Sequence, residues 1–357
     1  MKGLDLDRVD LLDSADPGGM LGRVEGFEDQ CRKAVEIGRG APLPAGRAFR
    51  AIVMAGMGGS AIGGDLLGTC FARDLRQPWV VNRGYSLPGW VDADTLLLVA
   101  SYSGNTEETL HAFEEGVSRG ATVVCLTSGG TLAARALEAG LPLIRIPGGL
   151  PPRAALGYSF FPLAVALGRL GLVPTSDTDL AEALETIRSA GERWGRSRPA
   201  AENTAKSLAL ALDGCLPLVY VGDGLLSSVA TRWKGQFNEN SKILAYTAVF
   251  PEVNHNEIEG WEGARRLGQR THLILLRDTD DSPRVQRRME VTTGIIGDRA
   301  DRITELWGNG RCRMARMFSL VCLGDFVSVY LALLSGTDPT PVDNIDRLKD
   351  ALANLPQ

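Results

Sequence analysis

The sequence contains little histidine, and its histidines have none of the spacings that bind metal. Only three occur in 357 residues, and neither H-x-x-H nor H-E-x-x-H is present. Those spacings place two imidazoles on one face of a helix, where both can bind zinc. Their absence argues against a zinc enzyme. The acidic residues Glu257, Glu259 and Glu262 are interpreted as a helical surface rather than a cation site.

Both common nucleotide-binding fingerprints are also missing. Residues 56–66 read GMGGSAIGGDL, and Ala61 stands where the dinucleotide fingerprint G-x-G-x-x-G requires its last glycine. The lysine of the Walker pattern is absent as well. Because this loop has no lysine or arginine, neutral groups would bind its ligand. That favours a phosphate monoester over the β- and γ-phosphates of a nucleotide.

The sequence also lacks three other features: an excess of positive charge, paired cysteines, and an uninterrupted apolar run long enough to span a membrane. The formal net charge is −5, which gives no reason to expect nucleic acid or an anionic membrane as a partner. Residues 318–334 form the longest apolar stretch, but Gly324 and Asp325 interrupt it, which predicts a buried helix. The six cysteines include no C-x-x-C pair, so we expect reduced thiols in a cytoplasmic protein.

Two strand-loop-helix crossings are the most informative segments that are present. Apolar runs at 51–54 and 96–100 have the length of buried parallel strands, and a turn rich in glycine or hydroxyl groups follows each. Each turn leads into a helix, whose free N-terminal N–H groups bind anions. Since neighbouring parallel strands end at one edge of a sheet, the two loops are expected to form one phosphate site. The predicted phosphate-binding residues are Gly59, Ser60, Ser101, Ser103 and Thr106, with Gly58 and Tyr102 lining the substrate pocket.

Strands and helices alternate twice along the chain, which predicts two α/β domains with parallel sheets flanked by helices. Residues 147–153 read PGGLPPR, a break in regular structure, and a long helical stretch follows from 161 to about 212. We place the first domain, with an N-terminal helical segment, at residues 1–152. The second, with connecting helices and a C-terminal helix, is placed at 153–357. It has no S-x-S-G-x-T turn, so one phosphate site per chain is expected.

The motifs GMGGSAIGGD and SYSGNTEET resemble the sugar isomerase (SIS) domain, in which the second loop holds the phosphate of a sugar phosphate. Four later segments, PPRAALGYSF, FNENSK, NHNEIEGW and DPTPVDNIDRLKDAL, resemble the bifunctional phosphoglucose/phosphomannose isomerase family. The resemblance covers nearly the whole chain. It implies two SIS-type doubly wound, flavodoxin-like domains. It also implies interconversion of glucose 6-phosphate and mannose 6-phosphate with fructose 6-phosphate, without a metal or cofactor.

The chemistry of such a reaction explains why these residue types are needed. One base can move a proton between adjacent carbons through a cis-enediol, and a partly shielded carboxylate such as Glu239 suits that role. Arg153 would stabilise the negative charge of the intermediate, while His255 and Lys349 would share the opening of the sugar ring. The resemblance implies the same roles and a homodimer in which His255 reaches the site from the neighbouring subunit. Thr340 is a candidate for lining the space that both configurations at C2 require.

Other interpretations remain open from the residues alone. Glu239 lies on a predicted helix near Arg232 and Lys242, so a surface ion pair would also explain it. His255 could cap a turn, and Lys349 could lie on the solvated face of the last helix. For the whole chain, the alternatives are another SIS-type isomerase acting on an amino-sugar phosphate, and a regulator that binds a sugar phosphate without catalysis.

Overall fold

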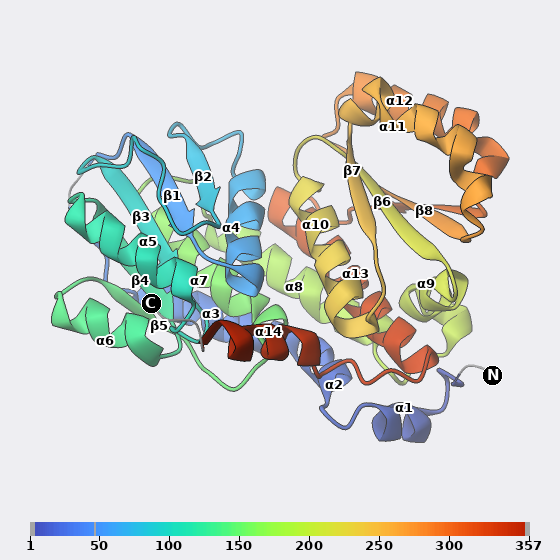
Figure 1. Ribbon diagram of the computed structural model, residues 1–357, viewed down its shortest axis with the longest axis horizontal. Coiled ribbons are helices and arrows are strands. Elements are labelled where there is room, and N and C mark those ends of the chain that lie inside the picture. Colours follow the sequence, from blue (N-terminus) through green and yellow to red (C-terminus); the bar gives the residue numbers. More distant parts are fainter. Residues whose placement is uncertain (1–3, 46–47, 354–357) are drawn as a thin grey trace.

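Two parallel β-sheets, each flanked by helices, make up the fold (Figure 1). The computed structural model describes residues 4–45 and 48–353. The five strands of the first sheet are β1 (Ala51–Ala55), β2 (Trp79–Asn82), β3 (Thr95–Ala100), β4 (Thr122–Thr127) and β5 (Leu143–Arg145). The four strands of the second are β6 (Leu216–Gly222), β7 (Tyr246–Phe250), β8 (Thr271–Arg277) and β9 (Arg302–Trp307).

Both sheets have the strand order of a doubly wound fold. The first runs β2-β1-β3-β4-β5 and the second runs β7-β6-β8-β9, with parallel pairing throughout. In each sheet the connections change side next to the first strand in the chain, which opens a crevice at the carboxyl ends of two neighbouring strands. The predicted flavodoxin-like α/β architecture is therefore confirmed.

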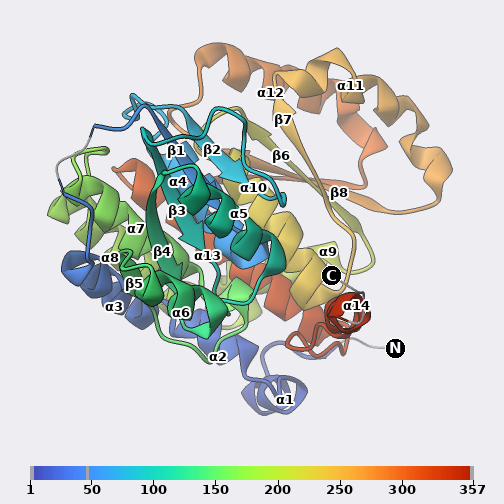
Figure 2. The same cartoon turned by 60° about the vertical axis from the view of Figure 1, so that its left-hand side comes forward.

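Alternate residues of the first sheet face two different helical layers, as the two-residue period of a strand requires. Val53, Leu97 and Val123 pack against α5 (Glu107–Ser118) and α6 (Gly130–Glu138). Figure 2 shows these two helices in front of the sheet. Ile52 and Leu96 point to the opposite side, into the core shared with α3 (Phe27–Gly40), α4 (Gly58–Cys70) and α7 (Leu156–Arg169).

The remaining helices surround the second sheet and the junction between the sheets. One face of the second sheet packs on α12 (Pro283–Ile296), and the other packs on α9 (Thr204–Leu212), α10 (Ser227–Gln236) and α13 (Arg313–Leu334). The others are α1 (Val9–Ala15), α2 (Met20–Glu25), α8 (Asp177–Trp194), α11 (Glu257–Gly260) and α14 (Asp343–Ala353). Short turns of other helix types are η1 (Pro152–Ala154), η2 (Ala200–Glu202), η3 (Phe237–Ser241), η4 (Glu252–His255), η5 (Trp261–Leu267) and η6 (Gly297–Arg299).

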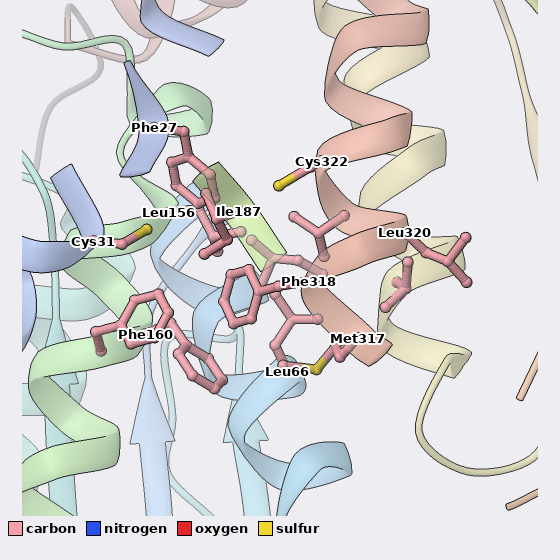
Figure 3. Close-up of a cluster of buried hydrophobic side chains, with 14 of the residues drawn as sticks. Phe27, Cys31, Leu66, Leu156, Phe160, Ile187, Met317, Phe318, Leu320 and Cys322 are labelled. Atoms are coloured by element: carbon pink, nitrogen blue, oxygen red, sulfur yellow. The ribbon is translucent and has the colours of Figure 1, made fainter. Parts of the chain in front are cut away.

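Helix α13 joins the two halves through one continuous hydrophobic core. Phe318 stacks on Phe161 with ring centroids 4.9 Å apart, and its edge contact with Phe160 has the same centroid distance (Figure 3). The helix is long and apolar enough to cross a membrane, but all of its apolar window is buried within the protein. The prediction of a buried helix at 318–334 is confirmed. Because the core crosses residue 152, the boundary between 1–152 and 153–357 stays a prediction.

The predicted helical stretch from 161 to about 212 consists of three helices, because α7 ends at Arg169 and the chain turns at Gly171, whose φ is +69°. Ser176 and Asn203 then cap two new helices, α8 and α9. The strands expected in the second half were 216–221, 272–276 and one near 302–306, so β7 was missed. This edge strand is only partly buried and lacks a clear alternation of apolar and polar residues.

Candidate active site

The two glycine- and hydroxyl-rich loops meet where the first sheet changes direction. Strands β1 and β3 are neighbours, so the loops that follow them lie side by side. The approach is close enough that a Cβ on Gly56 would lie 2.9 Å from the carbonyl oxygen of Ala100. Helices α4 and α5 both begin at this edge, with their N–H groups toward the same crevice.

Side-chain hydroxyls hold the two loops together. Ser60 Oγ accepts a hydrogen bond of 3.1 Å from the main-chain N–H of Tyr102, which ties the first loop to the second. Within the second loop, Ser101 Oγ lies 2.9 Å from Thr106 Oγ1 and also accepts from the N–H of Gly104. Ser103 is exposed at the tip. The predicted phosphate residues are therefore brought together in one crevice.

The first loop also contacts the turn that carries Arg153. A Cβ on Gly59 would lie 2.5 Å from the carbonyl oxygen of Pro152 and 3.1 Å from the N–H nitrogen of Arg153. Only a glycine permits this approach between the loop and η1. The distance between phosphate loop and arginine is thus fixed by direct main-chain packing.

Arg153 is almost completely buried and is held by several acceptors. Its Nε donates to Asn240 Oδ1 at 2.6 Å, and its Nη2 donates to the carbonyl oxygens of Pro339 at 2.7 Å and Thr340 at 2.8 Å. The remaining nitrogen, Nη1, lies 3.5 Å from a carboxylate oxygen of Glu239. Burial lowers the pKa of Arg153, and the charge of Glu239 opposes that shift. The guanidinium therefore remains a fixed cation beside a carboxylate that is 32% exposed.

Glu239 projects from η3, a π-helical turn that continues α10. Such turns widen the helix by one residue and often occur at functional sites. Lys242 ends the turn with a left-handed φ of +57°, which few residues other than glycine adopt. Its ammonium donates to the carbonyl oxygens of Glu239 and Pro339. Burial lowers the pKa of Lys242, and the nearby Arg153 acts in the same direction.

Comparison with known proteins shows the family to which the chain belongs. Residues 201–352 match the family described as the bacterial phospho-glucose isomerase C-terminal SIS domain. The chain is 42% identical over 337 residues to a bifunctional phosphoglucose/phosphomannose isomerase of Caldicellulosiruptor bescii, covering 94% of this chain and 99% of the relative. Identity to the protein of that name from Aquifex aeolicus is 38%, over 85% of this chain and 91% of the relative.

A solved structure shows the same fold. The structure of a glucose-6-phosphate isomerase like protein from Thermus thermophilus aligns over 95% of this chain and 98% of its own, with a TM-score of 0.63 and 22% identity. The chain belongs to the bifunctional phosphoglucose/phosphomannose isomerase family. The resemblance read from its motifs is therefore confirmed.

His255, which the family resemblance assigns to the site, lies apart from Glu239 within the chain. Glu239 precedes strand β7 and His255 follows it, so they are at opposite ends of a five-residue strand, about 16 Å long (Figure 1). His255 is exposed on η4. Lys349 is also exposed, on α14, and its ammonium pairs with Asp346 at 3.2 Å. Their roles stay predictions.

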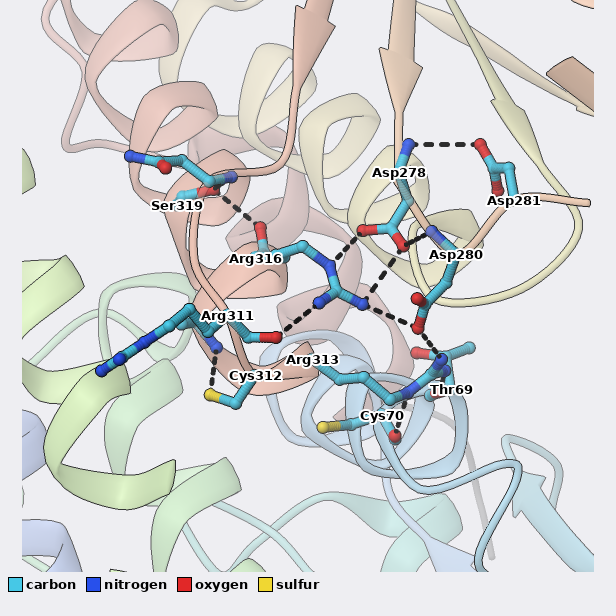
Figure 4. A network of polar contacts seen from close by, with 12 residues as sticks. Thr69, Cys70, Asp278, Asp280, Asp281, Arg311, Cys312, Arg313, Arg316 and Ser319 are labelled. Carbon is cyan, nitrogen blue, oxygen red and sulfur yellow. Dashed lines mark hydrogen bonds and ion pairs between the residues drawn. The ribbon is translucent and has the colours of Figure 1, made fainter. Parts of the chain in front are cut away.

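Charged side chains follow strand β8 at the carboxyl edge of the second sheet. Arg316 of α13 donates to Asp278 at 2.9 Å and pairs with Asp280 at 2.7 Å (Figure 4). Arg313 reaches from the same helix to Asp280 and to the carbonyl oxygens of Thr69 and Cys70 on α4. These ion pairs and hydrogen bonds join the two halves of the chain.

Several residues that build the site were not indicated by any pattern in the sequence. Asn240 directly follows the predicted base, and the sequence analysis assigned no role to it. Gly18 lies next to Thr340 across more than 300 residues, so only the folded chain brings them together. Among the residues that the structure describes, no group of three or more His, Cys, Asp or Glu side chains is arranged to hold a metal ion.

Proposed function

We propose that this protein interconverts fructose 6-phosphate with glucose 6-phosphate and with mannose 6-phosphate. The observation that carries the proposal is the direct packing of the phosphate loop at Gly59 on the turn of Arg153, which faces Glu239. A phosphate at the two loops would present the other end of a short sugar chain to this pair. Two of its relatives at 38% to 42% identity are named as isomerases of both sugars.

Glu239 would act as the base in both proton transfers. It takes a proton from C1 of the open-chain ketose, so the electrons of the C–H bond form the C1–C2 double bond and those of the C2 carbonyl move onto its oxygen. The hydroxyl proton of O1 passes to O2, which gives the cis-enediol and leaves the negative charge on O1. Glu239 then returns its proton to C2, on either face of the intermediate, and O1 becomes the carbonyl oxygen of glucose or mannose 6-phosphate. Arg153 would stabilise the negatively charged oxygen of the intermediate, as a cation that never loses its proton.

Thr340 would line the space needed for both products. Its Oγ1 is buried and has no hydrogen-bond partner within the described residues, and its main-chain carbonyl accepts from Arg153. A small side chain at this position leaves room for rotation about the C2–C3 bond. The reaction would need neither metal nor cofactor, because the base and the fixed cation together supply the charge stabilisation.

A homodimer would supply His255 to the neighbouring site, and Lys349 would assist it in opening the ring. Two observations support this. His255 and Glu239 lie at opposite ends of β7, which separates them within one chain. Exposed apolar side chains also lie at the start of β7 and on α14, as an interface would require. They are Leu244, Tyr246, Ile345, Leu348 and Leu352. A cytoplasmic location fits this substrate and the six free cysteines.

The test is turnover of fructose 6-phosphate in the presence of EDTA by the native chain and by Glu239→Gln. Formation of both aldose phosphates by the native chain, lost in the variant, is the expected result. No turnover by a folded native chain whose melting temperature still rises with fructose 6-phosphate would overturn the proposal in favour of a binding protein. Turnover of glucosamine 6-phosphate alone would point to an amino-sugar isomerase.

A further inference from the structure

Asn240 is fully buried next to the proposed base, and both ends of its amide are used. Its Oδ1 accepts from Arg153 Nε at 2.6 Å, and its Nδ2 donates to Ser328 Oγ at 2.9 Å. The Ser328 hydroxyl donates in turn to the carbonyl oxygen of Asp325 at 2.9 Å. The amide therefore connects the guanidinium of Arg153 to the middle of helix α13.

The same part of α13 holds the main chain of Arg153. Asp325 accepts two hydrogen bonds from Arg232, at 3.0 and 2.7 Å, and one from Gln236 at 2.8 Å. Arg232 Nη2 also donates to the carbonyl oxygen of Arg153 at 3.0 Å. Arg232, Gln236 and Asn240 recur every fourth residue, so they form one polar stripe along α10 and η3.

This stripe explains the polar residue that interrupts the apolar run of α13. Burial raises the pKa of Asp325, and the charge of Arg232 opposes the shift. Gly324 makes room for the indole of Trp233, because a Cβ there would lie 2.3 Å from its Nε1. A buried charge that is paired and fully hydrogen-bonded is retained where it fixes a geometry. Here the fixed geometry is that of Arg153.

We propose that Asn240 is a positioning residue for the isomerisation, holding the Arg153 guanidinium so that Nη1 faces the Glu239 carboxylate. This inference rests on the proposed function. The carbonyl oxygens of Pro339 and Thr340 hold only Nη2, at one corner of the guanidinium plane. The bond from Nε to Asn240 fixes a second corner and hence the orientation of the whole plane. Without it, the plane can turn and Nη1 leaves the base.

The experiment measures kcat and KM for fructose 6-phosphate in a cycle of native chain, Asn240→Ala, Arg153→Lys and the double variant. Asn240→Ala is expected to lower kcat on the order of 10- to 100-fold, with KM changed less than about threefold, because the phosphate loops are untouched. In the Arg153→Lys background the same change is expected to lower kcat less than about threefold, since lysine has no Nε for Asn240 to hold.

Asn203→Ala is the matched control. Asn203 is also buried, but it caps α9 by accepting from the N–H groups of Ala205 and Lys206. Its loss is expected to lower the melting temperature and leave kcat unchanged at temperatures where the chain is folded. A fall in kcat of equal size in both arginine and lysine backgrounds would overturn the inference and show a merely structural role.

Ser328→Ala provides a second variant in case Asn240→Ala does not fold. It removes the acceptor of the Asn240 amide and is expected to lower kcat by about threefold to tenfold, again only when Arg153 is present. An unchanged kcat in Ser328→Ala would count against the inference. If the proposed function itself is wrong, the native chain produces neither aldose phosphate. That result is distinct from failure of the positioning role, in which the native chain is active and the variants do not behave as expected.

Discussion

The side chain of Thr340 occupies the space in which residue 18 would place a Cβ. A Cβ built on Gly18 would lie only 2.1 Å from Thr340 Oγ1. Gly18 is in the turn between α1 and α2, where both carboxylate oxygens of Asp16 accept from the N–H groups of Met20 and Leu21. The N-terminal segment therefore sets the position of a residue that we place in the substrate pocket.

Replacing Gly18 by alanine is expected to change the ratio of the two products. The added methyl group forces Thr340 to move, and the space for rotation at C2–C3 changes with it. The initial rates of mannose 6-phosphate and glucose 6-phosphate formation from fructose 6-phosphate measure the ratio, which should shift at least about twofold. Gly40→Ala is the control, since a Cβ there meets no atom within 4 Å. An unchanged ratio would show that Thr340 does not line the substrate pocket.

Replacing Arg153 by lysine is expected to lower kcat by about 100-fold and to leave the affinity for fructose 6-phosphate within a few-fold of native. Lysine keeps the charge, but it cannot reach Asn240, Pro339 and Glu239 together as the guanidinium does. Rapid-mix turnover gives kcat, and the rise in melting temperature with fructose 6-phosphate reports binding. A variant with native kcat would show that charge alone suffices.

Mixing two inactive variants tests whether His255 of one subunit acts in the active site of the neighbouring subunit. Glu239→Gln and His255→Ala are each expected to be inactive as homodimers. After subunit exchange, half of the dimers are mixed, and one of their two sites has both an intact Glu239 and an intact His255. About one quarter of native activity should therefore return. If His255 acts within its own chain, mixing restores nothing, and co-purification of the untagged variant with an affinity-tagged one confirms that exchange has occurred.

The free energy of unfolding of the protein should depend on pH through the titration of Asp281. Burial raises the pKa of Asp281 from its ordinary value of 3.8 to about 6. Because the folded-state pKa is the higher one, the stabilisation that protonation provides is complete below about pH 4 and is lost as the pH rises through 6. Asp281→Asn keeps an acceptor for the N–H of Asp278 but does not titrate.

The Asp281→Asn chain is therefore expected to gain stability relative to native as the pH rises from 4 to 7. The gain should be about 1 kcal/mol, because the side chain is only partly buried and solvent screens its charge. Urea unfolding of both chains at pH 4 and pH 7 measures the difference. A difference that is the same at both pH values would contradict the assignment.

Local patterns in the sequence were enough to predict that the two glycine- and hydroxyl-rich loops meet. The apolar runs of β1 and β3 and the turns after them are contiguous, and adjacent strands in a doubly wound sheet bring such turns together. Edge strand β7 was missed because its residues are partly exposed and lack a clear period. The contacts of Arg153 were also beyond prediction. Asn240 and Pro339 are 87 and 186 residues away along the chain, so only tertiary packing joins them.

The assignment of Glu239 drew on family resemblance as much as on chemistry. A glutamate near Arg232 and Lys242 is compatible with a surface ion pair, and nothing local distinguishes that from a base. The structure shows that Arg232 instead pairs with the buried Asp325, and that Glu239 faces Arg153. His255 and Lys349 are both exposed, and the roles predicted for them stay predictions.

The shared core has a consequence for synthesis on the ribosome. Phe160 and Phe161 are made about 160 residues before Phe318, the ring against which they pack. At roughly 5 to 20 residues per second, the first sheet and α7 wait about 10 to 30 seconds for α13 to emerge. During that interval a large aromatic surface is open to water and to other nascent chains. Any dependence of folding on chaperones in the cell should therefore result from the late synthesis of α13.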